Sequence, residues 1–200
     1  MIKRAGQCIS LAVALPFALV SGFGRVPTLF QCMAHLMALL PGLPGDYLRT
    51  AYYTLTLEEC SINSRVSFGS FFAHRSAKVS AGVYIGAYCV LGKCEIGERT
   101  QIASSVQILS GRRQHLRLND GQLQGANEGQ FRRVSIGSDC WIGTLAVVMA
   151  DVGSGSTVGA GAVVVRPIPS GVVAVGNPAR ILDSEPRSEK DLGNEVRASS

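Results

Sequence analysis

Residues 134–181 decide the fold, and they read VSIGSDCWIGTLAVVMADVGSGSTVGAGAVVVRPIPSGVVAVGNPARI. Aliphatic residues recur six positions apart in two runs: Ile136, Ile142, Val148 and Val152, Val158, Val164. An amphipathic helix repeats every 3–4 residues and a half-buried strand every two, so neither explains this period. Short flat segments joined by tight corners do explain it. The stretch therefore predicts a β-helix whose stacked coils bury one aliphatic column on each face.

The same period extends toward the N-terminus, with one long interruption. Further residues at this spacing are Ile62 and Phe68, then Val79, Ile85 and Leu91, and, after a five-residue step, Ile96, Ile102 and Ile108. Residues 109–133 form a polar insert that breaks the period, which in a solenoid is typical of a functional or a disordered loop. The sequence therefore predicts a β-helix over residues 51–182 with a protruding loop, and a charged, disordered tail over residues 183–200.

The composition suits a β-helix and argues against other classes of protein. The 200 residues include 23 glycines and only 6% aromatic residues, as expected for small corners around a narrow aliphatic interior. The net charge of +5 is modest and the basic residues are scattered, which argues against nucleic-acid binding. None of the six cysteines forms a CxxC pair. This predicts no metal site and indicates reduced thiols in a cytoplasmic protein rather than a disulfide framework.

Residues 1–50 differ from the rest because they are almost free of charge. Lys3 and Arg4 precede an uncharged run from Ala5 to Gly24, and a second apolar run follows Arg25. The second run places its aliphatic residues on one stripe, which predicts an amphipathic helix. Three interpretations remain open. The uncharged lengths favour a segment that lies on or inserts into a membrane; the others are a segment packed on the β-helix or a neighbouring subunit, and a signal peptide.

Three motifs carry a family resemblance: IGSDCWIG at 136–143, VGAGAVVVRPIP at 158–169 and GNPAR at 176–180. They resemble the hexapeptide-repeat acyltransferases, and most closely the sugar O-acetyltransferase branch that includes galactoside and maltose acetyltransferases. The resemblance covers about residues 60–182. SGRRQH at 110–115, together with the apolar N-terminus, is similar to acetyltransferases of surface-polysaccharide synthesis.

The resemblance implies a left-handed parallel β-helix and a homotrimer, with each active site in a groove between neighbouring subunits. Left-handed crossovers depart from the usual right-handed rule for parallel strands, so the handedness rests on the resemblance alone. The resemblance also implies that a long acyl-CoA lies along the groove and that a histidine from an extended loop acts as general base.

His115 is the candidate base because it occupies the catalytic-loop place in the insert. Acetyl transfer to a hydroxyl requires removal of its proton, and an imidazole that titrates near neutrality suits that role. The branch often shows a Thr-His-Pro-like sequence earlier in this loop, whereas His115 follows Gly111-Arg112-Arg113-Gln114. Asp120 and Glu128 are candidates to orient the imidazole, although loop solvation is an alternative role for each.

The resemblance also assigns residues to acetyl-CoA. Thr144 and Ala160 match positions that contact the pantetheine arm, and Arg166 and Arg180 match basic positions that meet the nucleotide phosphates, for which guanidinium groups are well suited. Trp141 lies against the donor or acceptor, or packs under the loop. Basic residues make the insert suited to steering an anionic substrate, or simply to solubility: Arg112, Arg113, Arg117, Arg132 and Arg133. We interpret His74 as a stray repeat residue, with an acceptor contact as the alternative.

The sequence thus predicts an acetyl-CoA-dependent O-acetyltransferase that acts on a sugar hydroxyl of a cell-envelope polysaccharide or its lipid-linked precursor, at the inner face of the cytoplasmic membrane. Two alternatives remain open: N-acylation of a nucleotide-sugar amine by the same machinery, and a non-catalytic scaffold. A γ-class carbonic anhydrase would need three histidines at a metal, and only His74 and His115 lie in the repeat region.

Overall fold

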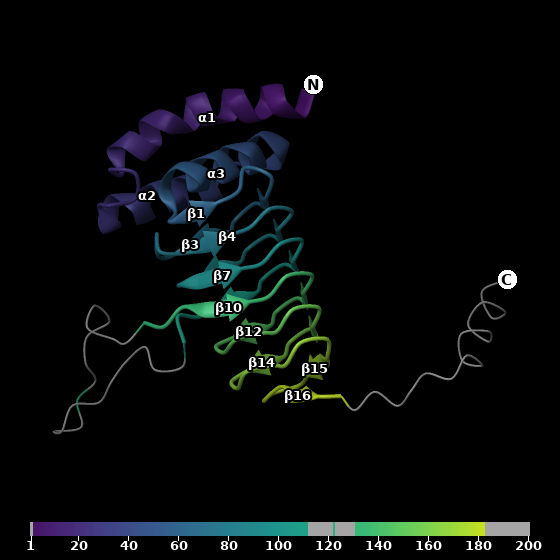
Figure 1. Ribbon diagram of the computed structural model, residues 1–200. Coiled ribbons are helices and arrows are strands. Elements are labelled where there is room, and N and C mark those ends of the chain that lie inside the picture. Colours follow the sequence, from purple (N-terminus) through teal and green to yellow (C-terminus); the bar gives the residue numbers. More distant parts are fainter. Residues whose placement is uncertain (1, 112–121, 123–130, 183–200) are drawn as a thin grey trace, which may run out of the picture.

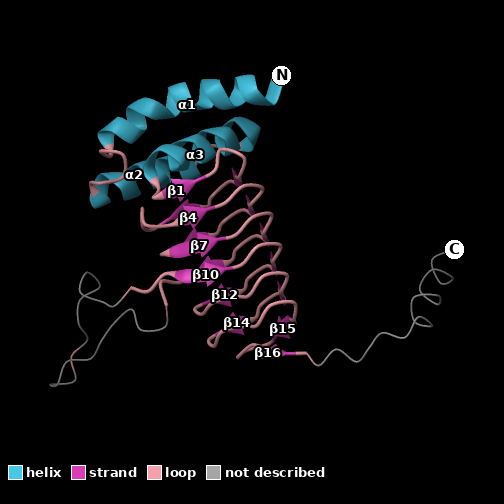
Figure 2. Ribbon diagram, viewed as in Figure 1, coloured by secondary structure: helices cyan, strands magenta, loops and turns pink. Residues whose placement is uncertain are grey.

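Three β-sheets, parallel except where the last strand β16 pairs with β15, wind into a β-helix beneath a cap of three helices (Figure 1, Figure 2). The computed structural model describes residues 2–111, 122 and 131–182, so the tail predicted over residues 183–200 lies outside the described residues. Sheet A contains β1 (Glu59–Cys60), β4 (Lys78–Val79), β7 (Cys94–Ile96) and β10 (Val134–Ile136). Sheet B contains β2 (Arg65–Val66), β5 (Tyr84–Ile85), β8 (Gln101–Ile102), β11 (Trp141–Ile142), β13 (Thr157–Val158), β15 (Val173–Val175) and β16 (Arg180–Ile181). Sheet C contains β3 (Phe71–Phe72), β6 (Val90–Leu91), β9 (Gln107–Ile108), β12 (Val147–Val148) and β14 (Val163–Val164).

Each short strand places one side chain in the interior, which confirms the predicted six-residue architecture. Sheet B buries Val66, Ile85, Ile102, Ile142, Val158 and Ala174 in register, and sheet C buries Phe72, Leu91, Ile108, Val148 and Val164. Burial of one such large aliphatic side chain is worth about 1.5–3 kcal/mol. The repeated columns therefore make a large contribution to the hydrophobic stabilisation.

The glycine that follows an inward residue lets successive coils approach. A Cβ atom on Gly137 would lie 2.4 Å from the backbone nitrogen of Ser154, and one on Gly153 would lie 2.4 Å from that of Ser170. Only glycine leaves room for the backbone of the next coil at these positions. The recurring aliphatic–Gly pair is thus a requirement of stacking.

The first coil has a different register from the predicted one. Val66 and Phe72 are fully buried, whereas Ile62 and Phe68 are only partly buried, so the assignment of the latter pair to the repeat was wrong. Val79, the next inward residue, is seven positions after Phe72 instead of six. Counting back from Val79 in steps of six therefore does not reach Phe72 and Val66, the inward residues of the first coil.

All departures from the six-residue period fall at one corner, where the chain passes from sheet C to sheet A. We call it the C–A corner, and the corner between sheets B and C the B–C corner. The inward residues across the C–A corner are Phe72 and Val79, Leu91 and Ile96, Ile108 and Ile136, Val148 and Val152, and Val164 and Ile168. The insert leaves and returns at this corner, between β9 and β10 (Figure 1).

The cap consists of α1 (Ile2–Val20), α2 (Pro27–Ala38) and α3 (Gly42–Thr56). It covers the N-terminal end of the β-helix: α3 packs on β1 and β2, α2 packs on β3, and α1 packs on α3 (Figure 1). Within the described residues, no helix is long and apolar enough to cross a membrane.

Arg49 of α3 joins the cap to the β-helix. Its side chain is fully buried, and its Nε donates to the carbonyl oxygen of Val66 at 3.0 Å. Its Nη1 donates to the carbonyls of Met37 and Leu40 at 3.0 and 2.6 Å, and its Nη2 donates to Asp46. Burial lowers the pKa of this guanidinium and Asp46 opposes that shift. One side chain therefore connects α2, α3 and the first coil.

Candidate functional site at the insert and two corners

The root of the insert is fixed on both sides. The backbone N–H of Arg132 donates to the carbonyl of Ser110 at 2.9 Å, which brings the departing and returning chain together. Arg132 also pairs with Asp151, while Arg133 pairs with Glu58 and donates to the carbonyl of Ser76. These two arginines, both candidates for steering an anionic substrate, are therefore engaged in ion pairs.

The candidates for acid–base chemistry lie outside the described residues. These are His115, Asp120 and Glu128, together with three of the insert arginines, Arg112, Arg113 and Arg117. The structure places only the root from which they extend. No group of three or more His, Cys, Asp or Glu side chains suited to a metal ion occurs in the described part of the chain.

Three of the residues assigned to acetyl-CoA lie along the B–C corner on successive coils. Thr144 follows β11 and Ala160 follows β13, and the N–H of Gly161 donates to the carbonyl of Thr144 at 2.8 Å. Arg180 of β16 pairs with Val175 at the end of β15. Ala160 and Arg180 are exposed, whereas the Thr144 hydroxyl already donates to the carbonyl of Ser104 at 2.7 Å.

The other two residues considered for the donor site, Trp141 and Arg166, lie elsewhere on the coils. Trp141 projects outward from sheet B with 60% of its surface exposed, so it does not pack under other described residues. Arg166 follows β14 and lies at the C–A corner, where it occupies the position equivalent to Ser110 two coils earlier. With about 4.8 Å between coils, Arg166 lies roughly 10 Å along the axis from the root of the insert.

A pocket that the sequence did not indicate opens at the C–A corner beneath the start of α2. It has a volume of about 380 Å³, and its lining includes Arg25, His74, Arg75, Lys93 and Phe131. The His74 ring lies 5.0 Å from that of Phe131, centroid to centroid. Burial, and secondarily Lys93, lowers the pKa of His74, so its imidazole is mostly neutral at pH 7. These residues come from separate segments, so no sequence motif marks the pocket.

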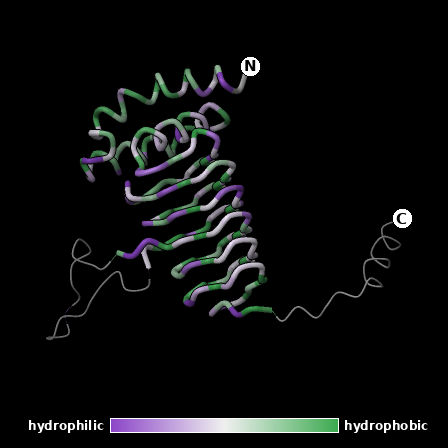
Figure 3. Tube along the Cα trace, viewed as in Figure 1, coloured by the Kyte–Doolittle hydropathy of each residue, from purple (hydrophilic) through white to green (hydrophobic). Residues whose placement is uncertain are grey.

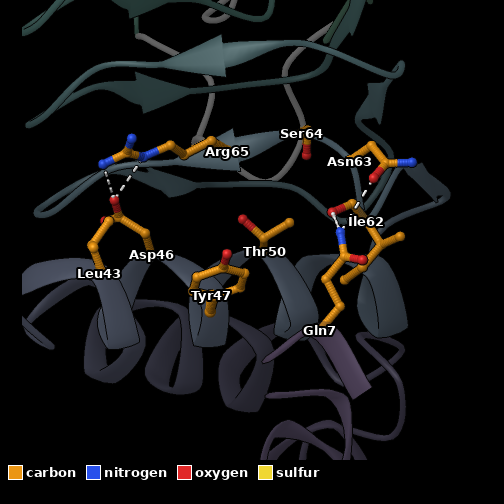
Figure 4. A pocket seen from close by; sticks show the side chains of 9 residues that line it. All are labelled: Gln7, Leu43, Asp46, Tyr47, Thr50, Ile62, Asn63, Ser64 and Arg65. Carbon is orange, nitrogen blue, oxygen red and sulfur yellow. Dashed lines mark hydrogen bonds and ion pairs between the residues drawn. The ribbon is translucent and has the colours of Figure 1, made fainter. Parts of the chain in front are cut away.

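A second pocket of about 260 Å³ lies between the cap and the first coil (Figure 4). Arg65 donates to Asp46 through Nε at 2.8 Å, and Gln7 donates to the carbonyl of Ile62 and to Asn63 (Figure 4). Within the described residues, the buried Thr50 hydroxyl has no hydrogen-bond partner. Most polar groups of this pocket bond to one another, so its main role is to join the cap to the β-helix.

Comparisons with known proteins agree with the fold. No family model matches the chain. The bifunctional protein GlmU of Azotobacter vinelandii is 31% identical over 117 residues, which are 58% of this chain and 22% of that protein. A 2,3,4,5-tetrahydropyridine-2,6-dicarboxylate N-acetyltransferase of Clostridium perfringens is 47% identical over 58 residues, which are 28% of this chain and 25% of that protein. The chain thus spans about a quarter of the length of these curated relatives.

Solved structures match over more of the chain. A maltose O-acetyltransferase from Clostridium difficile 630 superposes with a TM-score of 0.64 at 21% identity, over 84% of this chain and 90% of that chain. AntD, an N-acyltransferase from Bacillus cereus in complex with dTDP and coenzyme A, superposes with a TM-score of 0.52 at 20% identity, over 69% of this chain and 78% of that chain. Likeness at this level of identity shows the fold alone.

The repeats, the sheet topology and these matches define the class of the protein: a left-handed β-helix of hexapeptide repeats. Over part of its length the chain is similar to hexapeptide-repeat acetyltransferases. The matches include both O- and N-acyl transferases, so they do not select the sugar O-acetyltransferase branch among them.

Proposed function

We propose that the protein is an acetyl-CoA-dependent O-acetyltransferase that acts on a sugar hydroxyl of a cell-envelope polysaccharide or its lipid-linked precursor. The observation that carries the proposal is the anchored polar insert with its histidine, set into a hexapeptide β-helix. The likeness to a maltose O-acetyltransferase supports the same reaction class. Coenzyme A in the AntD complex supports the donor.

In the proposed reaction, His115 removes the proton of the acceptor hydroxyl as its oxygen attacks the thioester carbonyl. Asp120 or Glu128 orients the imidazole, and a backbone amide that follows Trp141 stabilises the developing oxyanion. The C–S bond then breaks, the acetyl group stays on the acceptor oxygen, and the imidazolium returns its proton to the sulfur of coenzyme A.

The arrangement within one chain supports a site shared between subunits. The root of the insert and Arg166 lie at the C–A corner, whereas Thr144, Ala160 and Arg180 lie at the B–C corner, so the width of sheet C separates the two groups. In a homotrimer, the C–A corner of one subunit can face the B–C corner of the next. We therefore propose that two neighbouring chains complete each site.

Calorimetric titration with acetyl-CoA tests the donor without knowledge of the acceptor. We expect saturable binding that Arg166→Ala and Arg180→Ala each weaken by about tenfold, because each removes one charged hydrogen bond to phosphate. Both arginines are exposed and have no acidic partner among the described residues, so their loss should leave the fold intact. Arg99→Gln, which removes a surface arginine paired with Asp139, serves as the control. Unchanged affinity in both variants would remove these residues from the donor site.

N-acylation of an amino sugar remains a second candidate because the 47%-identical relative is an N-acetyltransferase and AntD is an N-acyltransferase. The same base and donor site would serve an amine acceptor. A direct comparison of hydroxyl and amine forms of one acceptor sugar distinguishes the two reactions. A protein that binds neither acetyl-CoA nor a related donor would instead be a scaffold.

We also propose that the cap rests on an anionic membrane surface. Large aliphatic side chains are exposed along α1 and in and around α2: Ile9, Val13, Leu15, Leu19, Val20, Leu29, Leu36 and Leu39. Figure 3 shows α1 as hydrophobic over most of its length. The exposed side chains of Arg4 and Arg25 flank the ends of α1, which complements anionic lipid headgroups around an apolar face.

The double variant Ile9→Glu/Val13→Glu should bind vesicles of anionic phospholipid at least tenfold more weakly than the native chain. Each buried aliphatic contact is worth about 1.5–3 kcal/mol, and the new charges repel the surface. Flotation of the protein with vesicles measures this. Deletion of residues 1–45 is unsuitable, because Phe30 and Met37 are part of the core. Equal partitioning of the folded variant and the native chain would disprove the membrane contact.

A further inference from the structure

We propose that the pocket at the C–A corner beneath α2, called here the cationic pocket, binds a phosphate or diphosphate group of the acceptor. This inference rests on the proposed function and specifies its substrate class: a phosphorylated or diphosphate-linked saccharide. The pocket is formed by the cap and the first three coils, and it is separate from the corner positions assigned to acetyl-CoA.

Positive charge without a counter-charge is the first argument. Six of the described basic side chains form ion pairs with carboxylates: Arg49, Arg65, Lys78, Arg99, Arg132 and Arg133. Arg25, Arg75 and Lys93, all three of which line the cationic pocket, have no acidic partner among the described residues. Like charges gathered in one concavity repel one another, and a bound polyanion relieves that repulsion.

The close packing of the cap holds these charges together. Gly24, in the turn between α1 and α2, has a φ of +77°, and a Cβ atom there would lie 2.5 Å from the carbonyl oxygen of Thr56 and 3.4 Å from Cβ of Arg75. The turn therefore lies directly on the corner that carries Arg75. Gln31 of α2 also donates to the carbonyl of Ala73 at 3.3 Å. The cationic pocket thus lies at the packed junction between the cap and the coils, with Arg25 and Arg75 exposed at its edge.

The remaining lining suits a sugar phosphate. Lys93 Nζ lies 5.5 Å from the centroid of the Phe131 ring. The His74 ring lies 5.0 Å from the Phe131 ring, centroid to centroid. Arg25, Arg75 and Lys93 can together neutralise a diphosphate. The Phe131 ring offers an apolar surface to a sugar, and the mostly neutral imidazole of His74 can hydrogen-bond to a sugar hydroxyl. A volume of about 380 Å³ accommodates a diphosphate with part of a sugar ring.

The position of the cationic pocket relative to the insert links it to the reaction. His74, Lys93 and Ser110 follow the inward residues of β3, β6 and β9 by two positions, so they stack on successive coils of the C–A corner. The N–H of Lys93 donates to the hydroxyl of Ser110 at the root of the insert at 2.9 Å. Arg166 continues the same corner beyond the insert. The root of the insert therefore lies between the cationic pocket and the coils assigned to the donor.

The test uses inorganic pyrophosphate as the probe and the full chain saturated with acetyl-CoA, so that the donor site is filled. We expect calorimetry to detect saturable binding, weakened about tenfold by Arg75→Gln and by Lys93→Gln, because each removes one charged contact. Arg99→Gln is the control: Arg99 is an exposed arginine on the coils that pairs with Asp139, and its loss should leave the affinity unchanged. Circular dichroism verifies that each variant is folded.

The outcomes separate this inference from the proposed function. Equal affinity in all variants, absence of pyrophosphate binding, or competition between pyrophosphate and acetyl-CoA would each overturn the cationic pocket as an acceptor site. If acetyl-CoA fails to bind but pyrophosphate binding depends on Arg75 and Lys93, the anion site stands and the proposed function fails.

Two competitors identify the source of the phosphate. Uridine diphosphate represents a soluble nucleotide-linked sugar, and phosphatidylcholine vesicles that contain polyprenyl phosphate represent a lipid-linked one. Displacement of pyrophosphate by either competitor supports the inference and assigns the source. Displacement by neither, at concentrations at which pyrophosphate binds, contradicts it.

Discussion

The variant His115→Ala is expected to transfer acetyl groups about 10²-fold more slowly than the native chain, or slower still. Without the imidazole, a sugar hydroxyl must attack the thioester while it keeps its proton, and water is a poor substitute for a positioned base. The ends of the insert are tied together by Arg132 and Ser110 and pinned to the coils by Asp151 and Glu58. His115 is four positions after Gly111, which limits the distance between their Cα atoms to about 14 Å.

The measurement is single-turnover transfer from acetyl-CoA, with binding of acetyl-CoA measured in parallel. A catalytic base should affect the rate and leave donor affinity nearly unchanged. The plot of rate against pH should also lose its acidic limb, because that limb reports protonation of the imidazole. His35→Gln is the control: this histidine lies on α2, with its ring 4.6 Å from that of Phe71. Native turnover in folded His115→Ala would remove His115 from the mechanism.

Replacement of Arg49 by methionine should reduce the free energy of unfolding by about 3–5 kcal/mol, because it breaks a buried ion pair and leaves the remaining carboxylate buried. Methionine fills much of the volume but donates no hydrogen bonds. The carbonyls of Val66, Met37 and Leu40 would lose their donor, and Asp46 would retain only Arg65.

Urea unfolding measures this loss, and Arg99→Met provides the comparison. Arg99 pairs with Asp139 and Glu98 at the surface, where water replaces a lost partner, so that variant should change stability far less. Because Arg49 joins α2, α3 and β2, we also expect the cap of Arg49→Met to exchange its amide hydrogens faster than the distant coils do. Equal stability of the two variants would show that Arg49 does not hold the junction.

The six-residue spacing of aliphatic residues predicted the β-helix well, because this spacing specifies which side chains point into the interior. Ile136, Ile142 and Val148 point inward simply because the chain turns a corner every six residues. The same logic failed at Ile62 and Phe68, where a seven-residue step shifts the register. The candidate site was only partly predictable. The motifs predicted donor contacts at Thr144, Ala160, Arg180 and Arg166, and the structure places the first three along one corner and Arg166 at another.

The sequence by itself determined the repeat, the position of the insert and the apolar character of the first 50 residues, since each is a property of neighbouring positions. How the helices close the end of the β-helix, and which charges among the described residues lack a carboxylate partner, became clear only from the three-dimensional arrangement. Arg25, Arg75 and Lys93 meet only because the chain winds back to the same corner once per coil and the cap folds over it. Long-range winding of this kind brings residues together without leaving any periodicity among them.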